Sequence, residues 1–416
     1  MIGARFVLLT LALPLLGSYA RRFGNVRALP LSARIPVYFA TGLFTIVAEM
    51  FVLTSLGVKW SAAWLLPLPI ILSLLPPYRR GETVAPKQRD AALIIAFIAL
   101  AVLVSSVLAG ALTSGDYVIF WGTKGQRFGQ TQTLDYAFTL DPNHYMHPDY
   151  PPLVPFFYAW TMLGGDGAFD WWGGILSAPM FLGLGVAAMW GFGRHAGIRV
   201  AGPMTALFAS SYALFYIRNA VAGNAEPALH FFETVALCAL TCWRDHENEH
   251  NAIAAIALAG VTLTKVEGGV FVAIVLLLTC LSRARWKVGI LPVLTLSSWL
   301  LFGYVHGLTD TYVPREDLSI RYLVPTAREL VHELALRLHY TPWIAATIIL
   351  FSGRARRAMP YVLASLGFIA FLLSVYTRAE PHLDWSAGRT LMTPLLLFYF
   401  AAIAAHRPVP QAAPGV

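Results

Sequence analysis

Charged residues are scarce in this chain of 416 residues, because Asp, Glu, Lys and Arg together make up only 12% of it. Soluble domains carry about twice that share, so the composition excludes an ordinary soluble domain. The mean hydropathy of +0.62 indicates instead a protein whose helices lie in a membrane. Cysteine is scarce too. Cys238, Cys242 and Cys280 all fall in apolar segments, which favours neither a disulfide framework nor a zinc site.

Long apolar runs make up most of the sequence. Runs of about 18–22 residues recur along the chain, and each is long enough to cross a hydrocarbon core of about 30 Å. They predict an all-α polytopic membrane protein with about 12 or 13 transmembrane helices. The predicted spans are 3–20, 35–57, 60–77, 91–112, 172–192, 199–217, 224–243, 251–264, 267–281, 288–306, 336–352, 358–376 and 389–405. The pair at 251–264 and 267–281 is shorter than the others and is interrupted.

The net charge of +8 comes from basic residues that cluster at span ends, so it does not indicate nucleic-acid binding. Cytoplasmic loops are rich in Lys and Arg, and this rule predicts the N-terminus outside and the C-terminus inside. The basic clusters begin with Arg21, Arg22, Arg27 and Arg34. The same orientation places four polar loops on the extracytoplasmic side: 113–150, 218–226, 307–325 and 377–388.

Three regions follow from this pattern. Residues 1–90 hold three leading transmembrane helices without candidate chemistry, and residues 406–416 form a cytoplasmic tail. Residues 91–405 form the functional core, which opens with a structured extracytoplasmic loop at 113–163. Its last part, 151–163, is apolar but short. We expect it to lie in the interface or to re-enter, because a crossing there would invert every later loop.

The polar loop that follows the span at 91–112 gathers the most reactive side chains. Asp116 is expected at the membrane surface, where a carboxylate acts as a general base or simply caps the next helix. Trp121, Lys124 and Arg127 follow at helical spacing. Cations beside a base suit a phosphate-bearing substrate, and the alternative is an interfacial belt with snorkelling side chains.

A second group in the same loop raises the question of a metal. His-x-x-His spacing with flanking carboxylates resembles a ligand set, but prolines in the segment argue against the helix that it needs. Hydrogen bonding within the loop, or sugar recognition, is therefore favoured over a metal site. The group comprises Asp141, His144, His147 and Asp149.

Ionisable residues also fall within later predicted spans, where they are costly and indicate function by default. Glu226, His230 and Glu233 share one helical face, which suits a proton relay, the floor of an active site or a buried polar network. Lys265 lies beside Glu267 in a tight reversal between two short spans. It is predicted either to contact a phosphate or to pair with that glutamate.

The last polar loop, RAEPHLDWSAGRTLM, carries His382, Asp384 and Trp385 and ends with Arg389 at the start of the final span. An arginine at that depth is well placed for a lipid phosphate. A snorkelling anchor is the alternative, although the positive-inside rule disfavours an arginine on this side.

Five short motifs follow one another along the chain: GDYVIFWGTKGQRFG with Asp116, HPDYPPLVP from His147, AGNAEPAL with Glu226, TKVEG from Thr264, and SAGRTLM with Arg389. In this order they resemble the motifs of the GT-C superfamily of membrane glycosyltransferases. The similarity is to the branch of protein O-mannosyltransferases and lipid A aminoarabinose transferases, and it covers roughly residues 91–405. Gly388 stands where the family pattern often has an acid.

The resemblance implies transfer of a monosaccharide, with inversion, from a polyprenyl-phosphate-linked donor to a glycan, lipid or protein acceptor. Asp116 would be the general base, and Glu226 would orient donor or acceptor hydroxyls. The resemblance implies no cofactor, and a divalent metal stays open. Lys124, Arg127, Lys265 and Arg389 would compete as phosphate ligands. The residues that would bind sugar or acceptor are Trp121, His147, Asp149, Tyr150, His382, Asp384 and Trp385.

Two other functions stay open on the residues alone. One is a proton-coupled transporter or a flippase for lipid-linked sugars, which the ionisable face of the span at 224–243 would serve. The other is an enzyme that polymerises or ligates glycans from a lipid diphosphate. A bias toward Arg and Ala suggests a bacterium with GC-rich DNA, hence the cytoplasmic (inner) membrane with the site facing the periplasm. The sequence does not specify the sugar, the acceptor, the prenyl length or the oligomeric state.

Overall fold

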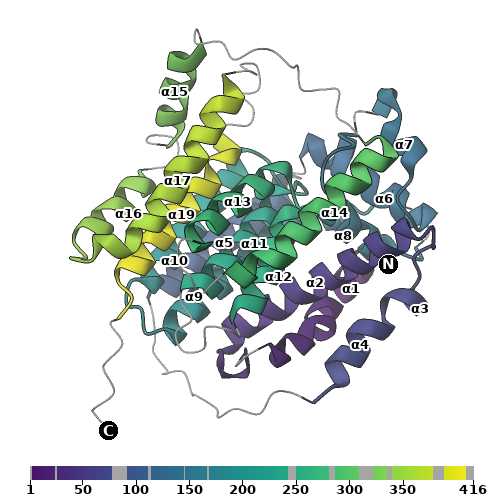
Figure 1. Cartoon of the computed structure of the whole chain (residues 1–416), viewed down its shortest axis with the longest axis horizontal. Helices are drawn as coiled ribbons and strands as arrows, with labels where there is room; N and C mark the ends of the chain where they lie inside the picture. Colours follow the sequence, from purple (N-terminus) through teal and green to yellow (C-terminus); the bar gives the residue numbers. More distant parts are fainter. Residues whose placement is uncertain are drawn as a thin grey trace.

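The computed structural model describes residues 2–23, 26–76, 91–110, 114–144, 146–165, 168–241, 250–280, 286–308, 322–334, 340–377 and 388–408. Within these ranges the chain folds into helices joined by turns, without an extended strand. Figure 1 shows long helices that run side by side, with α6, α7 and α8 together near one end of them.

The helices begin and end as follows, in chain order: α1 (Ile2–Leu16), α2 (Leu31–Ser55), α3 (Ala62–Leu65), α4 (Pro67–Leu74), α5 (Ala92–Gly110), α6 (Gly122–Thr131), α7 (Tyr136–Leu140), α8 (Leu153–Met162), α9 (Trp171–His195), α10 (Ala201–Arg218), α11 (Glu226–Thr241), α12 (His250–Thr262), α13 (Val266–Cys280), α14 (Ile290–His306), α15 (Leu323–His332), α16 (Thr341–Leu350), α17 (Ala355–Tyr376) and α19 (Met392–Ala405). Short turns of other helix types are η1 (Gly17–Arg22), η2 (Val26–Ala28), η3 (Tyr117–Trp121), η4 (Pro142–His144) and η5 (Trp286–Gly289).

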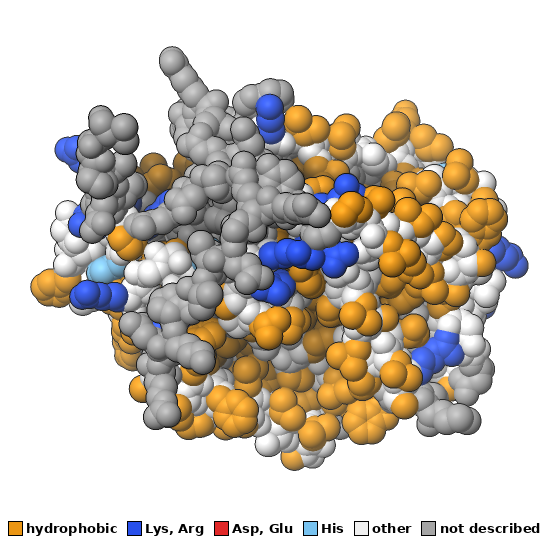
Figure 2. Space-filling model, turned by 90° about the horizontal axis from the view of Figure 1, so that it is seen from below, with side chains coloured by type: hydrophobic (Ala, Val, Ile, Leu, Met, Phe, Trp, Pro, Cys, Tyr) orange, Lys and Arg blue, Asp and Glu red, His pale blue; other side chains and the backbone are white. Residues whose placement is uncertain are grey.

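Six helices in the described ranges are long and apolar enough to cross a membrane. Hydrophobic side chains cover much of the face shown in Figure 2, as expected where lipid replaces water. The structure therefore agrees with an all-α, multi-pass membrane protein, and the larger number of spans stays a prediction. The six are Leu31–Ser55, Ala92–Gly110, Trp171–His195, Lys287–His306, Ala355–Tyr376 and Gly388–Ala405.

The predicted span at 60–77 is a broken helix rather than a continuous one. Its two pieces, α3 and α4, together cover Ala62–Leu74, which corresponds to about 20 Å at 1.5 Å per residue. Pro67 and Pro69 lack the backbone N–H that a continuous helix needs at those positions. This segment is therefore shorter than the hydrocarbon core that the sequence pattern led us to expect it to cross.

The leading helices pack directly on the core helices. In α2, the Phe39 ring meets Phe181 of α9 and Phe231 of α11 at centroid distances of 5.9 and 5.6 Å. The Trp160 indole of α8 donates a hydrogen bond to the Leu9 carbonyl of α1. The helices α1 and α2 thus share one buried interior with helices of the predicted core.

The polar loop after α5 is built on α8. Gly125 and Gly129 of α6 face α8, where a Cβ would lie 2.3 Å from the Tyr158 side chain and 3.2 Å from that of Met162. Small residues at this spacing let two helices approach closely. At ten residues, α8 is about 15 Å long, too short to cross a bilayer. Its residues 153–161 are buried beneath α6 and beside α1 and α2.

A close crossing of α1 and α2 gives a test of this packing. A Cβ on Gly42 would lie 2.0 Å from the Leu13 carbonyl oxygen, a backbone atom that cannot move aside easily. We expect Gly42→Ala to lower the free energy of unfolding by at least about 1–3 kcal/mol through overpacking. Gly183→Ala is the matched control, because its Cβ would meet nothing closer than 4.0 Å. Detergent-phase unfolding curves compare the two, and equal stability would contradict this packing.

Candidate functional site

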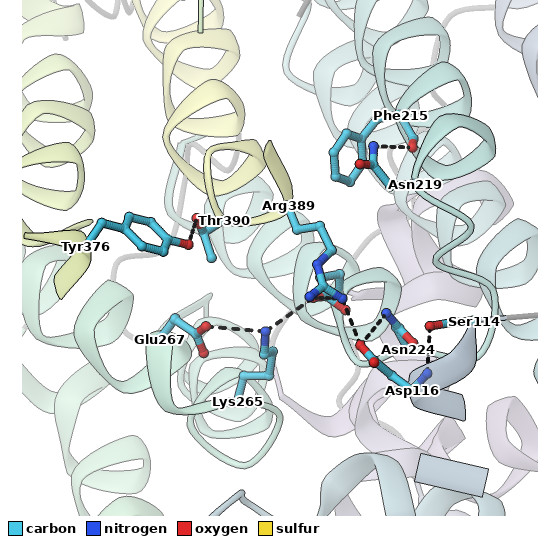
Figure 3. Close-up of polar contacts among 11 residues, drawn as sticks. Ser114, Asp116, Phe215, Asn219, Asn224, Lys265, Glu267, Tyr376, Arg389 and Thr390 are labelled. Atoms are coloured by element: carbon cyan, nitrogen blue, oxygen red, sulfur yellow. Dashed lines mark hydrogen bonds and ion pairs between the residues drawn. The ribbon is translucent and has the colours of Figure 1, made fainter. Parts of the chain in front are cut away.

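Arg389 lies between two carboxylates that come from distant parts of the chain. Its Nη1 is 2.8 Å from Oδ2 of Asp116, a residue 273 positions away, and 3.7 Å from Oε1 of Glu226. The Asn224 side-chain amide donates to the same Asp116 oxygen at 3.3 Å. Figure 3 shows Arg389 reaching from the last helical segment toward Asp116, with Lys265 pointing into the same region from the other side.

Lys265 extends this arrangement further into the protein. Its Nζ is 3.2 Å from Oε1 of Glu226 and 3.3 Å from Oε1 of Glu267. Five charged residues thus form one continuous set of ion pairs, which we call the charge network: Asp116, Arg389, Glu226, Lys265 and Glu267. Its three carboxylates and two cations leave one net negative charge.

The charge network is most exposed at Asp116 and most deeply buried at its middle members. The Asp116 side chain is 51% exposed and that of Arg389 is 22% exposed, whereas that of Glu226 is only 5% exposed. A ligand that approaches from solvent on this side therefore meets Asp116 and Arg389 first. Three buried polar atoms of the site have no hydrogen-bond partner in the described structure: Arg389 Nε and Asn224 Oδ1 on the Asp116 side, and Glu267 Oε2 at the other end of the network.

The backbone around Asp116 is fixed by its neighbours. Ser114 accepts the Asp116 N–H through its hydroxyl and donates its own N–H to the Ala222 carbonyl. The next residue, Tyr117, is fully buried, and its ring occupies space left by three glycines. A Cβ on any of them would lie within 2.7 Å of that ring: Gly122, Gly174 and Gly223. The carboxylate of Asp116 thus projects from a rigid support.

The segment before α11 is held just as firmly. Gly223 has a positive φ of 91°, a conformation that favours glycine. The Tyr158 hydroxyl donates to its carbonyl at 2.9 Å, and its N–H donates to the Ser177 hydroxyl at 3.1 Å. This fixed turn presents Asn224 to Asp116 and starts α11 at Glu226, where a helix N-terminus favours negative charge.

Lys265 occupies the turn between α12 and α13. The Leu153 N–H donates to the Leu263 carbonyl at 2.8 Å, which ties this turn to the polar loop. Burial by itself would lower the pKa of Lys265, but the carboxylates of Glu226 and then Glu267 outweigh it and raise the pKa above its ordinary value. The ammonium therefore stays charged despite its burial.

Three of the residues predicted to bind sugar or acceptor form an aromatic cluster. The Tyr150 ring stacks on Trp121 at 5.7 Å and on His147 at 4.9 Å. Lys124 is buried beside them, with its Nζ 3.0 Å from the His147 carbonyl and 4.5 Å from the Phe120 ring centroid. Burial, and next the charge of Glu267, raise the pKa of Tyr150 above its ordinary value.

The remaining predicted residues lie elsewhere or outside the described ranges. Arg127 Nε pairs with Asp135 at 2.7 Å on the loop surface. Burial tends to raise the pKa of Asp135, but the Phe138 amide and then Arg127 outweigh it and lower that pKa. The Asp149 carbonyl accepts a hydrogen bond from the Trp299 indole at 3.1 Å. His382, Asp384 and Trp385 fall outside the residues that the structure describes.

The ionisable face of α11 divides into separate contacts. His230 Nδ1 is 2.9 Å from the Tyr216 hydroxyl, and the Thr393 hydroxyl lies 2.9 and 3.1 Å from the two Glu233 oxygens. Within the described residues, no hydrogen bond joins His230 to Glu226 or Glu233. The described part of the chain also holds no group of three His, Cys, Asp or Glu side chains placed to bind a metal.

Asp116, Glu226, Lys265 and Arg389 were predicted from the sequence as site residues, but Asn224 was not. Asn224 could have been considered, because it stands two residues before Glu226 in the AGNAEPAL motif. Asparagine is common in turns, so an asparagine beside Gly223 indicates a turn and not a binding site. Its hydrogen bond to Asp116 arises from contact between distant segments, which the sequence does not show.

Comparisons with protein-family models, with curated proteins and with solved structures found no match to this chain. The resemblance to GT-C enzymes therefore rests on the five short motifs.

Removal of the buried cation tests the charge network. We expect Lys265→Met to lower the free energy of unfolding by about 3–5 kcal/mol, because Glu226 and Glu267 lose the cation between them and Glu226 keeps only the longer contact with Arg389, at 3.7 Å. Adding Glu226→Gln removes one of the two carboxylate charges and should restore part of the loss. Unfolding in detergent measures both variants, and a double variant no more stable than the single one would show that Lys265 does not balance Glu226.

Proposed function

We propose that this protein is an integral membrane glycosyltransferase. It would transfer a monosaccharide from a polyprenyl-phosphate donor to a glycan, lipid or protein acceptor on the extracytoplasmic face of a bacterial inner membrane. On this proposal the helices shorter than a full span complete a bundle of about 12 or 13 transmembrane segments. The five motifs suggest the type of reaction through their resemblance to GT-C enzymes. The charge network is the observation that supports the location of the active site.

The charge network supports this function because it collects residues from four of the five motifs at one place. Asp116, Glu226, Lys265 and Arg389 come from segments far apart in the chain, yet each lies within 4 Å of another member. An acid, two cations and a second acid are what a transfer from a phosphate-linked donor requires. The more exposed part of the network carries the acid and one cation together.

Among the four cations predicted to compete for the donor phosphate, the geometry favours Arg389. Lys124 donates to a backbone carbonyl and Arg127 pairs with Asp135. Lys265 is 10% exposed and lies between two glutamates. Arg389 is more exposed, and its Nε has no partner within the described structure. We assign it as the phosphate ligand and assign Lys265 as the residue that holds Glu226 in place.

The proposed reaction exchanges one ion pair for another. The donor phosphate binds Arg389, which releases the Asp116 carboxylate. Asp116 then removes the proton from the acceptor hydroxyl or amine, and the acceptor attacks the anomeric carbon with inversion. The anomeric C–O bond breaks, and its electron pair leaves with the polyprenyl phosphate, whose charge Arg389 stabilises. The aromatic cluster of Trp121, His147 and Tyr150 would stack on the sugar.

Release of free polyprenyl phosphate from a panel of lipid-phosphate sugars tests this proposal. Asp116→Asn keeps an oxygen for Arg389 but removes the base, so turnover should fall by about 10²- to 10⁴-fold without loss of folding. Asp141→Asn makes the same change in an acid of the same loop and should leave turnover unchanged. Wild-type turnover by Asp116→Asn, or no release with any donor by folded protein, would reject the assignment.

A transporter is the second candidate, and Glu233 is the observation that favours it. This carboxylate is fully buried in α11, and within the described residues only Thr393 bonds to it. A membrane-embedded acid without a cation partner is the kind of group that carries protons in transport. Proton-coupled uptake or flipping in proteoliposomes, without a glycosidic product, would support this alternative.

Glu233→Gln separates the two functions. The glutamine keeps the size and can still accept the Thr393 hydrogen bond, but it cannot release a proton. A transferase should retain phosphate release within about threefold, because Glu233 lies about 10 Å along α11 from Glu226. A proton-coupled transporter should lose uptake. Loss of phosphate release in a folded Glu233→Gln protein would contradict the site assigned here. Acceptance of an oligosaccharide diphosphate in place of the monophosphate would indicate a polymerase or ligase.

A further inference from the structure

A second cluster of cations lies around a cavity that the proposed reaction does not use. The cavity has a volume of about 260 Å³ and is lined by Arg21, Arg27, Arg34 and Tyr38. These residues come from η1, η2 and the first turns of α2. A liquid water molecule takes up about 30 Å³, so the space admits a group of several heavy atoms.

The arginines are held in place by backbone carbonyls rather than by acids. Arg21 donates to the Ser73 carbonyl of α4. Arg34 donates to the carbonyls of Arg27 and Leu29, the latter at 2.9 Å. No carboxylate of the described residues forms an ion pair with the three, and the buried Nε atoms of Arg21 and Arg34 have no partner there. Three positive charges thus face one cavity, and no acid of the described residues pairs with them.

The position of this cavity relative to α2 indicates its setting. Arg34 lies in the first turn of α2, whereas Phe51 near its other end packs on Trp299, which bonds to the polar loop at Asp149. The 25 residues of α2 span about 37 Å, somewhat more than a hydrocarbon core of about 30 Å. With α2 as a membrane span, the cavity would lie at headgroup depth, at the end of α2 away from the charge network.

We propose that Arg21, Arg27, Arg34 and Tyr38 form a binding site for a phosphate group, either that of an anionic lipid headgroup or free inorganic phosphate. Guanidinium groups bind phosphate oxygens in pairs, and one phosphate offers oxygens to several arginines at once. The Tyr38 hydroxyl adds a neutral donor. The site is separate from the proposed transferase site and does not depend on it.

Arg27→Gln is the variant of choice, because the Arg27 side chain is exposed and only its backbone carbonyl serves the fold. Arg22→Gln is the matched control, since Arg22 lies in the same segment and does not line the cavity. Delipidated protein in neutral detergent is titrated with inorganic phosphate and, separately, with phosphatidylglycerol, using diacylglycerol as the lipid without a phosphate. Thermal unfolding and calorimetry report binding.

Wild-type protein and Arg22→Gln should bind phosphatidylglycerol but not diacylglycerol, and Arg27→Gln should bind it about tenfold or more weakly. Binding of inorganic phosphate alone, with the same loss in Arg27→Gln, would support the site and identify a free anion as its ligand. Equal binding by Arg27→Gln and wild type, or binding of neither phosphate compound by folded wild-type protein, would overturn the proposal.

Discussion

The ion pair between Arg389 and Asp116 is the contact on which the rest of the charge network depends. It joins residues 273 positions apart and places the start of the last helix against the segment that follows α5. A charge moved from water into a protein interior needs a partner, because the cost of desolvation is several kcal/mol per ion. Glu226 and Lys265 are deeply buried, so α11, the turn after α12 and the last helix must meet at this place. Pairing of these charges therefore fixes how four segments lie together.

The charge network has a buried pair, Glu226 and Lys265, and a more exposed pair, Asp116 and Arg389, and the two pairs have different roles. Glu226 and Lys265 balance each other where solvent is largely excluded, and Glu226, with Glu267 as the second contributor, keeps the lysine charged. Such a pair specifies an arrangement more than it stabilises a fold. Asp116 and Arg389 lie where a ligand from solvent can compete for either charge. The rigid supports behind them, the Tyr117 ring among three glycines and the Gly223 turn, hold the two groups without help from the ligand.

Composition predicted the helical membrane class, because apolar runs of that length have few other uses. The charged members of the network could also be predicted, since ionisable residues are few in an apolar chain. Which residue pairs with which could not be predicted. In the sequence, Lys124 and Arg127 are as good candidates for a phosphate ligand as Arg389. In the structure, Lys124 donates to a backbone carbonyl and Arg127 pairs with an aspartate. The folding of the loop decides these partners. Hydropathy likewise treats 60–77 as a span, although Pro67 and Pro69 interrupt its hydrogen bonding.

The ion pair between Asp116 and Arg389 must be broken by any ligand that replaces either residue as the partner of the other. An anion that takes Arg389 leaves Asp116 without its cation, and a group that displaces Arg389 from Asp116 leaves Arg389 with Glu226 as its remaining acid in the network. Either partial exchange breaks the ion pair and replaces only one side of it. A ligand set that supplies a phosphate to Arg389 and a donor hydroxyl or amine to Asp116 satisfies both at once. On the proposed function, the ion pair therefore favours binding of donor and acceptor together, which would limit transfer of the sugar to water.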